Sequence, residues 1–303
     1  MAHAVRLSLR PILFAFLTSA IFVSVARGAD KPEPSLPHEM EYDFRGSKPL
    51  PPGIILAGAL DGAATQPESS GFRITIVGDQ PVPIDRAGLE INTTLKGDFE
   101  ITAGYELLRA DQPKEGYGVG FELFVHPAEA PQQGVFQGLG IYRVARVEQP
   151  NIYMLSHNHI KNGKPAYDQA YFPTNVRVGK LRISRSGAKA TASAAEGTDG
   201  PFKELRSYPL GSDDISVIWL MAFAGHSKSA LDLRVTDVKI RASAPIPSLE
   251  WTNAREANAT GALPRRFGLY AAAGLLILLL LATAVLAFLR RRASSHSGNG
   301  TAA

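Results

Sequence analysis

Apolar and polar side chains alternate with a period of two through the middle of this chain. From Phe99 to Leu107 every second residue is apolar or small, and the residues between them include Glu100 and Glu106. The pattern recurs from Val119 to Val125 and from Ile215 to Phe223. Because successive side chains of a strand point to opposite faces, this pattern predicts strands with one buried face. No segment of this region keeps a helical period, so we expect an all-β fold.

Other segments and turns agree with a sheet protein. Further strands are expected at residues 72–77, 139–147, 152–156, 176–185, 188–194 and 231–241. Ser186 and Gly187 predict a two-residue hairpin turn, because glycine readily adopts positive φ. A change of apolar phase near Thr236 and Asp237 predicts a β-bulge. About ten to fourteen short strands in one domain indicate a two-sheet antiparallel sandwich or jelly roll.

Several short motifs in fixed order resemble those of a known family. They are Tyr42–Gly46, Pro49–Pro51, Gly97–Glu100, Gly116–Gly120, Asp213–Ile215 and Leu231–Val238. Together they resemble an uncharacterised bacterial domain family of the concanavalin A-like lectin/glucanase superfamily, a laminin-G-like sandwich. The resemblance covers residues 42–242 and implies a concanavalin A-like jelly roll. It implies no catalytic residue, because this superfamily hosts lectins, sugar hydrolases and adhesion modules.

The C-terminal part of the chain carries a long apolar run. Phe267–Leu289 contains no charged residue and is followed by Arg290, Arg291 and Arg292. As a helix, this run is about 34 Å long, enough to cross the roughly 30 Å hydrocarbon core of a bilayer. It predicts one transmembrane helix that anchors the chain in a membrane.

The N-terminus is typical of a secretory signal peptide. Arg6 and Arg10 precede a mostly apolar stretch at residues 12–26, and the small residues Ala26 and Gly28 follow. We expect cleavage after Gly28, with cleavage after Ala26 as a second possibility. The alternative is an uncleaved signal anchor, which leaves the middle of the chain on the same side of the membrane.

These features predict an order of segments and a topology. The order is a signal peptide (1–28), a Pro-rich N-terminal segment (29–53), a β-sandwich (54–242), a polar stalk (243–266), a transmembrane helix (267–289) and a cytoplasmic tail (290–303). The signal peptide directs the sandwich outward, and the arginines after the helix then lie where positive charge is favoured. We therefore expect a single-pass membrane protein whose sandwich is extracytoplasmic, in the periplasm or at the cell surface.

Composition limits the chemistry of the exterior domain. The chain has no cysteine, which excludes disulfides, thiolate catalysis and cysteine-containing zinc sites. Its net charge of +4 comes largely from arginines near the two apolar segments, so no nucleic-acid partner is expected. The expected partners are the membrane, through the C-terminal helix, and a glycan or an envelope protein. No cofactor is expected.

An aromatic segment is the best candidate for a ligand site. Tyr167, Tyr171 and Phe172 lie between two prolines, in what we expect to be a loop. Their rings offer flat apolar surfaces for stacking on a sugar, while Asn158, Asp168 or Gln169 bind its hydroxyls. The alternative is that these rings cap the end of the sandwich, the commoner fate of aromatic residues between strands.

Two histidines form a candidate metal site. His157 and His159 share one face of a predicted strand and lie about 6.8 Å apart along it, a geometry that zinc sites use. A third ligand has to come from elsewhere, with His126 or Asp168 as candidates. The alternative is the polar face of a strand that leads into the turn at residues 161–164.

Two pairs of acidic residues are candidates for a site, one pair for catalysis and the other for calcium binding. Asp98 and Glu100 lie about 7 Å apart on one strand face, within the range of glycosidase carboxyl pairs. The Glu-x-Asp-x-Glu strand of glucanases with this fold is absent, which favours solvated carboxylates. Asp213 and Asp214 suit a turn before a strand, with calcium binding as the alternative.

The sequence thus leads to one functional hypothesis and two alternatives. The hypothesis is a non-enzymatic, membrane-tethered lectin-like domain that binds a glycan or a protein at the cell envelope. The alternatives are an envelope glycoside hydrolase that uses Asp98 and Glu100, and a purely structural envelope domain.

Overall fold

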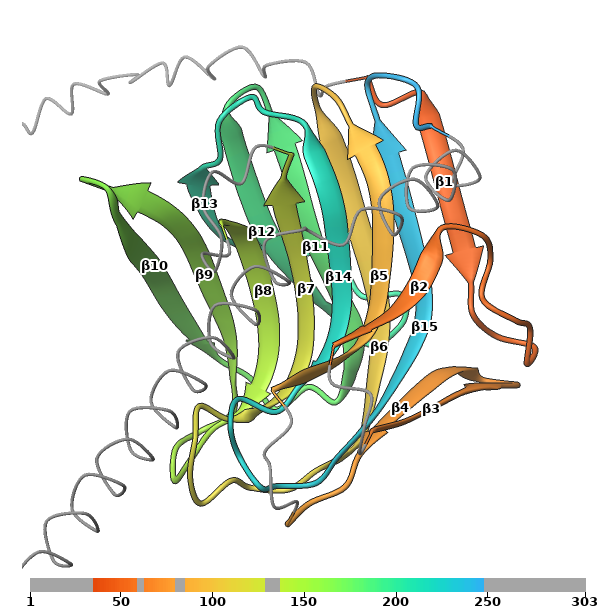
Figure 1. The fold of residues 1–303 in the computed structure, drawn as a ribbon, viewed down its shortest axis with the longest axis vertical. Helices are drawn as coiled ribbons and strands as arrows, with labels where there is room; N and C mark the ends of the chain where they lie inside the picture. The colour runs from red at the N-terminus through yellow and green to blue at the C-terminus, as the bar shows by residue number, and fades with distance from the viewer. Residues whose placement is uncertain (1–34, 59–62, 80–84, 129–136, 248–303) are drawn as a thin grey trace, which may run out of the picture. The chain divides into compact units, whose positions relative to one another are not determined.

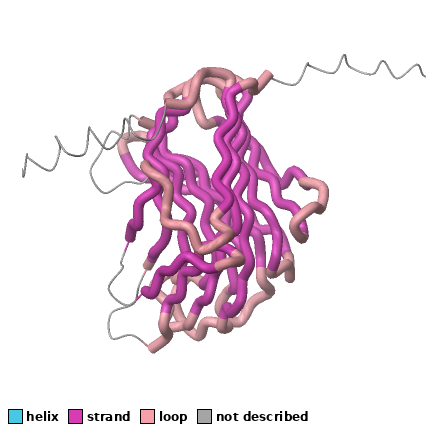
Figure 2. The backbone as a smooth tube through the Cα atoms, turned by 90° about the vertical axis from the view of Figure 1, so that its right-hand side faces the viewer, coloured by secondary structure: helices cyan, strands magenta, loops and turns pink. Residues whose placement is uncertain are grey.

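The computed structural model describes residues 35–58, 63–79, 85–128 and 137–247. These residues form fifteen strands in two antiparallel sheets, as the all-β prediction requires (Figures 1 and 2). No helix among these residues is long and apolar enough to cross a membrane. The predicted signal peptide, transmembrane helix and cytoplasmic tail, and most of the predicted stalk, lie outside the described residues.

The first sheet, sheet A, has the strand order β13-β12-β11-β6-β15-β4-β3, and β1 also pairs with β15. In chain order its strands are β1 (His38–Asp43), β3 (Ala63–Glu68), β4 (Gly71–Ile76), β6 (Phe99–Ala110), β11 (Val178–Ser186), β12 (Lys189–Glu196), β13 (Lys203–Pro209) and β15 (Leu231–Ala242). Strands β6 and β15 lie next to each other although they are far apart in the sequence. This arrangement places the two longest strands at the centre of the sheet.

The second sheet, sheet B, has the strand order β10-β9-β8-β7-β14-β5-β2. Its strands are β2 (Ile54–Gly58), β5 (Arg86–Leu95), β7 (Val119–Pro127), β8 (Gly138–Ala145), β9 (Ile152–Lys161), β10 (Lys164–Pro173) and β14 (Ile215–Phe223). In Figure 1 the β9–β10 hairpin forms one end of this sheet, beside β13 of sheet A. Strand β10 is an edge strand with a single neighbour.

The two sheets share one hydrophobic core. Its members include Ile101 and Val238 from sheet A and Leu123 and Leu220 from sheet B, all fully buried. Ile101, Val238 and Leu123 belong to the apolar phases seen in the sequence, so the alternation predicted the buried side of β6, β15 and β7. On β14 the prediction was wrong: Leu220 and its phase face the core, whereas Trp219 and Phe223 of the expected phase lie on the other side of sheet B, because the register shifts between Ile215 and Val217. Burial of one such side chain contributes roughly 1.5–3 kcal/mol, and the core alone therefore supplies a large driving force for sandwich formation.

Local geometry confirms one prediction about irregular positions and corrects another. The register of β15 shifts between Val235 and Asp237, where the β-bulge was expected. The turn between β11 and β12 is formed by Gly187 and Ala188, one residue later than predicted, because Ser186 still pairs with Lys189. Gly187 has a φ of 59°, which suits the first central position of a type II′ turn.

The sandwich begins earlier in the chain than residue 54. Strand β1 lies within the segment expected to be an extended approach to the domain, and it pairs with β15 over its full length. Met40 and Tyr42 pack against the core from this strand. Strands β2, β3, β5, β10 and β13 are also additional to those expected from the sequence.

The prediction of a loop around Tyr167 was wrong, because residues 164–173 form strand β10. Pro165 and Pro173 lie close to the two ends of this strand. Proline cannot donate a ladder hydrogen bond, but an edge strand does not need every N–H group for pairing. The two prolines are therefore compatible with an edge strand, although they suggested a loop.

Candidate functional site

The side of sheet B that faces away from the core carries a second apolar cluster. It consists of Phe124, Tyr142, Val144, Ile152 and Phe223, with Met154 and Trp219 packed against it. Strand pairing aligns these side chains in rows: Tyr171 lies opposite Met154, and Met154 opposite Tyr142. We call this side the outer face of sheet B. The five members of the cluster are at most 5% exposed, so the centre of this face is apolar and largely covered.

A pocket of about 600 Å³ opens on this face beside the β8, β9 and β10 strands. Its apolar lining includes Tyr117, Tyr142, Met154, Tyr167, Tyr171 and Phe223. Its polar lining includes Asp85, Arg86, Arg146, Ser156, Asn158 and Gln169. We call it the aromatic pocket. Flat rings and several hydrogen-bonding groups thus face one cavity, which is the composition of a small-ligand site.

The structure separates the three aromatic residues singled out in the sequence. Tyr167 and Tyr171 alternate with Gln169 on the outer side of β10, where they are 60% and 48% exposed. Phe172 points to the other side of the strand and packs against the core. Two of the rings therefore line the aromatic pocket, and the third stabilises the sandwich.

The ring of Tyr171 is held in place from two sides. Its hydroxyl donates a hydrogen bond of 2.5 Å to Oε1 of Gln169. The guanidinium carbon of Arg146 lies 5.0 Å from the ring centroid, in cation–π contact. On the neighbouring strand, the Ser156 hydroxyl donates to Oδ1 of Asn158 at 2.6 Å. These contacts limit the freedom of the pocket's side chains before any ligand arrives.

A buried carboxylate supports the pocket from within the sheet. Glu122 of β7 is fully buried, and its Oε2 lies 2.6 Å from Nε of Arg86. Nη1 of Arg86 lies 2.7 Å from Oδ2 of Asp85, so one guanidinium joins two carboxylates. Burial raises the pKa of Glu122, while the charge of Arg86 and the hydroxyl of Tyr142 act in the opposite direction.

The two predicted histidine ligands lie on the core side of β9. The closest nitrogen and oxygen atoms of His157 and Asp168 are 3.9 Å apart, and those of His159 and Asp168 are 3.8 Å apart. His126, the other candidate for a third ligand, is on the outer face of sheet B, where its ring contacts Phe124 and Trp219. Burial lowers its pKa to about 4. Of the two candidates, the structure brings only Asp168 to the pair.

The acidic pairs from the sequence lie elsewhere. Glu100 is on the outward side of sheet A, where its carboxylate pairs with Arg182 at 3.2 Å and with Arg241 at 3.6 Å. Oδ1 of Asp98 accepts a hydrogen bond from the backbone of Gly187. Neither residue lines the aromatic pocket. Among the described residues, Asp213 and Asp214 do not belong to a group of three or more side chains with metal-binding geometry.

Comparison with known proteins identifies the family. A model described as "Protein of unknown function (DUF1583) C domain" matches residues 23–248. The chain belongs to this family. A search of curated proteins returned no match. The DUF1583 C domain thus spans the whole of the described sandwich and begins before β1.

Solved structures with a similar arrangement include several lectin-type domains. A legume lectin-like domain from Entamoeba histolytica is 13% identical, covers 63% of this chain and 91% of its own, and has a TM-score of 0.45. The VIP36 exoplasmic/lumenal domain in its Ca²⁺/Man3GlcNAc-bound form is 14% identical, covers 63% and 84%, and has a TM-score of 0.43. Lectin UEA-II complexed with galactose is 13% identical, covers 68% and 99%, and has a TM-score of 0.44. The sandwich of the DUF1583 C domain itself is established by its strand pairing.

Much of the aromatic pocket was missed in the sequence. Tyr142, Met154 and Phe223 come from three strands, and only sheet pairing brings them to one face. A signal was present on β7, because Phe124 is an aromatic residue in the phase expected to face solvent. In the DUF1583 C domain, an aromatic residue on the expected polar phase of a strand is such a signal, because it indicates that the outer face of the sheet is covered or binds a ligand.

Proposed function

We propose that the DUF1583 C domain of this chain binds a glycan in the aromatic pocket. The observation that carries the proposal is the placement of two exposed tyrosines, Tyr167 and Tyr171, at a cavity that also presents amide and hydroxyl groups. Sugars have apolar C–H faces and hydroxyl edges, and this pocket offers a partner for each. The proposal does not require a catalytic group.

Pre-positioned side chains support binding at this place. Ordering a free side chain on binding costs about 0.5–1.5 kcal/mol, and part of that cost is avoided when the ring is already held. Tyr171 is held by Gln169 and Arg146, and Asn158 is held by Ser156. The polar atoms of these residues lie on neighbouring strands and are available at fixed spacing for the hydroxyls of a sugar.

A hydrolytic role for Asp98 and Glu100 receives no support from the geometry. Both residues lie outside the aromatic pocket, and Glu100 is neutralised by two arginines. A general acid needs a carboxyl group that contacts the scissile bond and has a raised pKa. We therefore favour binding without bond cleavage.

We further propose that the sandwich is extracytoplasmic and tethered by the run at residues 267–289. The support for this topology is the sequence alone: a secretory-type N-terminus, a long uncharged run and an arginine triplet after it. Alkaline phosphatase fused at Pro247 is expected to be active outside the cytoplasm. A reporter fused after Ala303 should be active only inside, and export of that reporter would overturn the single-anchor topology.

Binding is tested with the full chain in detergent against a glycan array and immobilised polysaccharides. Saturable binding without release of product supports the proposal, and loss of at least tenfold in affinity is expected for Tyr171→Ala and Tyr167→Ala. Tyr171→Phe keeps the ring and should lose less than Tyr171→Ala. The matched control is Val178→Ala, which shortens an exposed apolar side chain of sheet A and should leave binding unchanged.

Two results would contradict the proposal. Release of shortened sugars by the wild-type chain would indicate a hydrolase. Absence of binding to every glycan, or wild-type affinity in a folded Tyr171→Ala variant, would remove the aromatic pocket as a glycan site and favour the structural alternative.

A further inference from the structure

The β9–β10 hairpin carries a separate group of polar side chains on its core side. His157 and His159 are two residues apart in β9, and Asp168 of β10 lies opposite His157 in the register. Because alternate residues share a face, all three side chains project to the same side of the hairpin. Tyr208 of β13 in sheet A contacts the ring of His157 at 5.5 Å between centroids. The group therefore lies between the two sheets, at their open edge.

The polar atoms of this group surround a common point but do not bond to one another. One ligand atom from each of His157, His159 and Asp168 can be chosen so that all lie within 4.8 Å of one another. The shortest nitrogen–oxygen distances, 3.8 and 3.9 Å, are too long for hydrogen bonds. The two imidazole rings are stacked, with centroids 4.8 Å apart and planes 16° apart. Stacking brings two potential metal ligands close together but provides no hydrogen bond to either ring nitrogen.

Buried polar atoms without partners mark the same place. Nδ1 of His157 is buried and has no hydrogen-bond partner among the described residues, and the same holds for the hydroxyl oxygen of Tyr208. His157 is 7% exposed and Tyr208 is 4% exposed. Buried polar atoms are almost always bonded in folded proteins, so each unsatisfied atom here requires an explanation. A bound cation would explain the nitrogen directly.

We propose that His157, His159 and Asp168 form a zinc site of the open type, with water or another ligand completing the coordination. Two imidazoles and one carboxylate are a donor set that Zn²⁺ uses when it keeps a free position. Nitrogen ligands exclude the oxygen-preferring ions Ca²⁺ and Mg²⁺. This site lies on the opposite side of the hairpin from the aromatic pocket, and it stands independently of the glycan proposal.

The geometry is close to that of a bound site. With metal–ligand distances of about 2.0–2.1 Å, tetrahedral ligand atoms are about 3.4 Å apart, so Asp168 has to approach each histidine by about 0.5 Å. The Asp168 side chain is 63% exposed and can make this movement without disturbing the core. The three ligand atoms lie within 4.8 Å of one another, so the two rings also have to bring their nitrogens closer together. The imidazole rings also have to tilt out of their stack, because each lone pair lies in the plane of its ring. Nδ1 of His159 is only 3.4 Å from the backbone oxygen of His157, a long contact that costs little to give up.

The protonation state of the buried histidine favours a metal ligand. Burial lowers the pKa of His157, with a further contribution from His159, while Asp168 opposes both. Metal binding requires the neutral form of the imidazole, which burial favours. The carboxylate of Asp168 supplies one negative charge and reduces the net charge of a bound divalent ion.

The test uses the full chain in detergent, treated with a chelator and then titrated with Zn²⁺ in a calorimeter. The wild-type chain is expected to bind Zn²⁺ and to show the visible absorption of four-coordinate Co²⁺ when Co²⁺ replaces it. Asp168→Asn and His159→Gln should each weaken this binding by more than tenfold. Asp168 is largely exposed and His159 is only partly buried, so both variants are expected to fold, which an unchanged thermal midpoint without metal verifies.

His226→Gln is the matched control, because His226 is exposed and lies outside the group. It should bind Zn²⁺ as the wild type does, which shows that loss of an exposed histidine outside the group does not weaken binding. The proposal is overturned if the wild-type chain binds no Zn²⁺, or if folded Asp168→Asn and His159→Gln variants keep wild-type affinity. Neither result would decide whether the chain binds a glycan, because that test requires no metal.

Discussion

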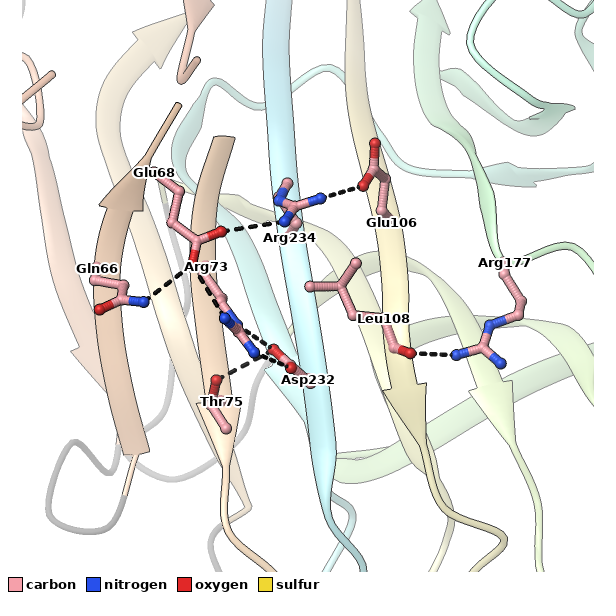
Figure 3. A network of polar contacts seen from close by, with 9 residues as sticks. All are labelled: Gln66, Glu68, Arg73, Thr75, Glu106, Leu108, Arg177, Asp232 and Arg234. Carbon is pink, nitrogen blue, oxygen red and sulfur yellow. Dashed lines mark hydrogen bonds and ion pairs between the residues drawn. The ribbon is translucent and has the colours of Figure 1, made fainter. Parts of the chain in front are cut away.

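The two sheets differ in the side chains that they present on the side facing away from the core. On sheet A, charged side chains of neighbouring strands pair with one another across the surface, as Figure 3 shows. On sheet B, the corresponding positions hold aromatic and apolar side chains, and the main ion pair involves the fully buried Glu122. Both sheets use the same alternation to build the shared core. The difference lies in the residues of the alternate phase, whose side chains face away from the core.

The network on sheet A is internally complementary. Arg73 binds Asp232 through two hydrogen bonds of 2.5 and 2.8 Å, and it also reaches Glu68. Arg234 joins Glu68 to Glu106, so the network runs across β3, β4, β15 and β6 (Figure 3). Each charge already has a partner of opposite sign. In this network the charges of the side chains are already paired with one another.

The outer face of sheet B, in contrast, carries side chains that a ligand could contact. Its tyrosines at the aromatic pocket remain exposed, and the groups next to them are fixed but accessible. Apolar rings at a cavity gain free energy when a ligand displaces water from them. The two faces therefore separate a stabilising surface from a candidate recognition surface, and substitutions on each face should have different consequences.

The largest expected effect comes from comparing two glutamate truncations, Glu122→Ala on sheet B and Glu106→Ala on sheet A. Glu122→Ala leaves Arg86 without its buried partner and should lower the free energy of unfolding by about 4 kcal/mol. Glu106→Ala removes a partly exposed partner of Arg234 and should cost about 1 kcal/mol. Chemical denaturation of both variants measures the difference. Glu122→Gln, which keeps the volume, should cost less than Glu122→Ala, and equal losses for Glu122→Ala and Glu106→Ala would break the contrast.

A pH effect of about 3 kcal/mol is expected from His126 on the outer face of sheet B. Burial lowers the pKa of this histidine to about 4 in the folded state, whereas an unfolded histidine has a pKa near 6.5. Between these values the unfolded chain binds more protons, so stability falls as the pH is lowered from about 7 to about 4. Denaturation curves across this range measure the loss.

The contribution of His126 is isolated by comparing the pH profile of wild type with that of His126→Gln. The variant should lose part of the slope, because other groups, including His157, keep theirs. Parallel profiles for the two proteins would mean that His126 becomes protonated without cost, and that the outer face of sheet B is more hydrated than its burial indicates.

Strand β10 permits the same contrast within one element. Phe172→Ala removes a ring packed against the core and should cost about 2 kcal/mol. Tyr171→Ala, one residue earlier, removes a half-exposed ring and should change stability by no more than about 0.5 kcal/mol. Thermal and chemical denaturation of the two variants provide the measurement. A large loss for Tyr171→Ala would assign this ring to the core, contrary to its exposure.

A modest, salt-dependent effect is expected in the network of sheet A. Asp232→Asn should cost about 1 kcal/mol at low ionic strength and less at high ionic strength, because salt screens exposed charges. The hydrogen bond from Arg73 lowers the pKa of Asp232, so its contribution is present above about pH 4 and is lost as the pH falls through the lowered value. A cost that does not change with salt would show that packing, and not charge, dominates this position.

The sequence predicted most of the sandwich where alternation was strong, and it failed where edges or turns intervened. Strands such as β6 and β7 were visible because their apolar phase is continuous over many residues, and β15 because its phase changes only at the bulge. Strand β14 was found as a strand, but its buried side was assigned to the wrong phase. Strand β13 is short, polar and at an edge, where little of it needs to be buried. Strand β5 does alternate, with Ala87, Leu89 and Ile91 buried, and was overlooked.

The candidate site was only partly predictable for a different reason. Tyr167 and Tyr171 could be found because they lie close together in the sequence, whereas Tyr142 and Phe223 reach the pocket only through the pairing of distant strands. The ion pair between Glu122 and Arg86 depends on the same long-range pairing, since these residues come from β7 and β5 on either side of β14. Local pattern determines which way a side chain points, but the order of strands determines its neighbours.

The position of β10 at the end of sheet B has one further consequence. Asp168 lies between Tyr167 and Gln169 in the chain; its side chain points to the core side of β10, and those of Tyr167 and Gln169 point to the outer side. Strand β10 pairs with β9 alone, so no strand on its other side restrains its backbone. If a ligand moves the backbone of β10 as it draws Asp168 inward, Tyr167 and Gln169 move with it. Binding events on the two sides of this strand would share a coupling free energy, and by thermodynamic linkage each would change the affinity of the other by the same factor.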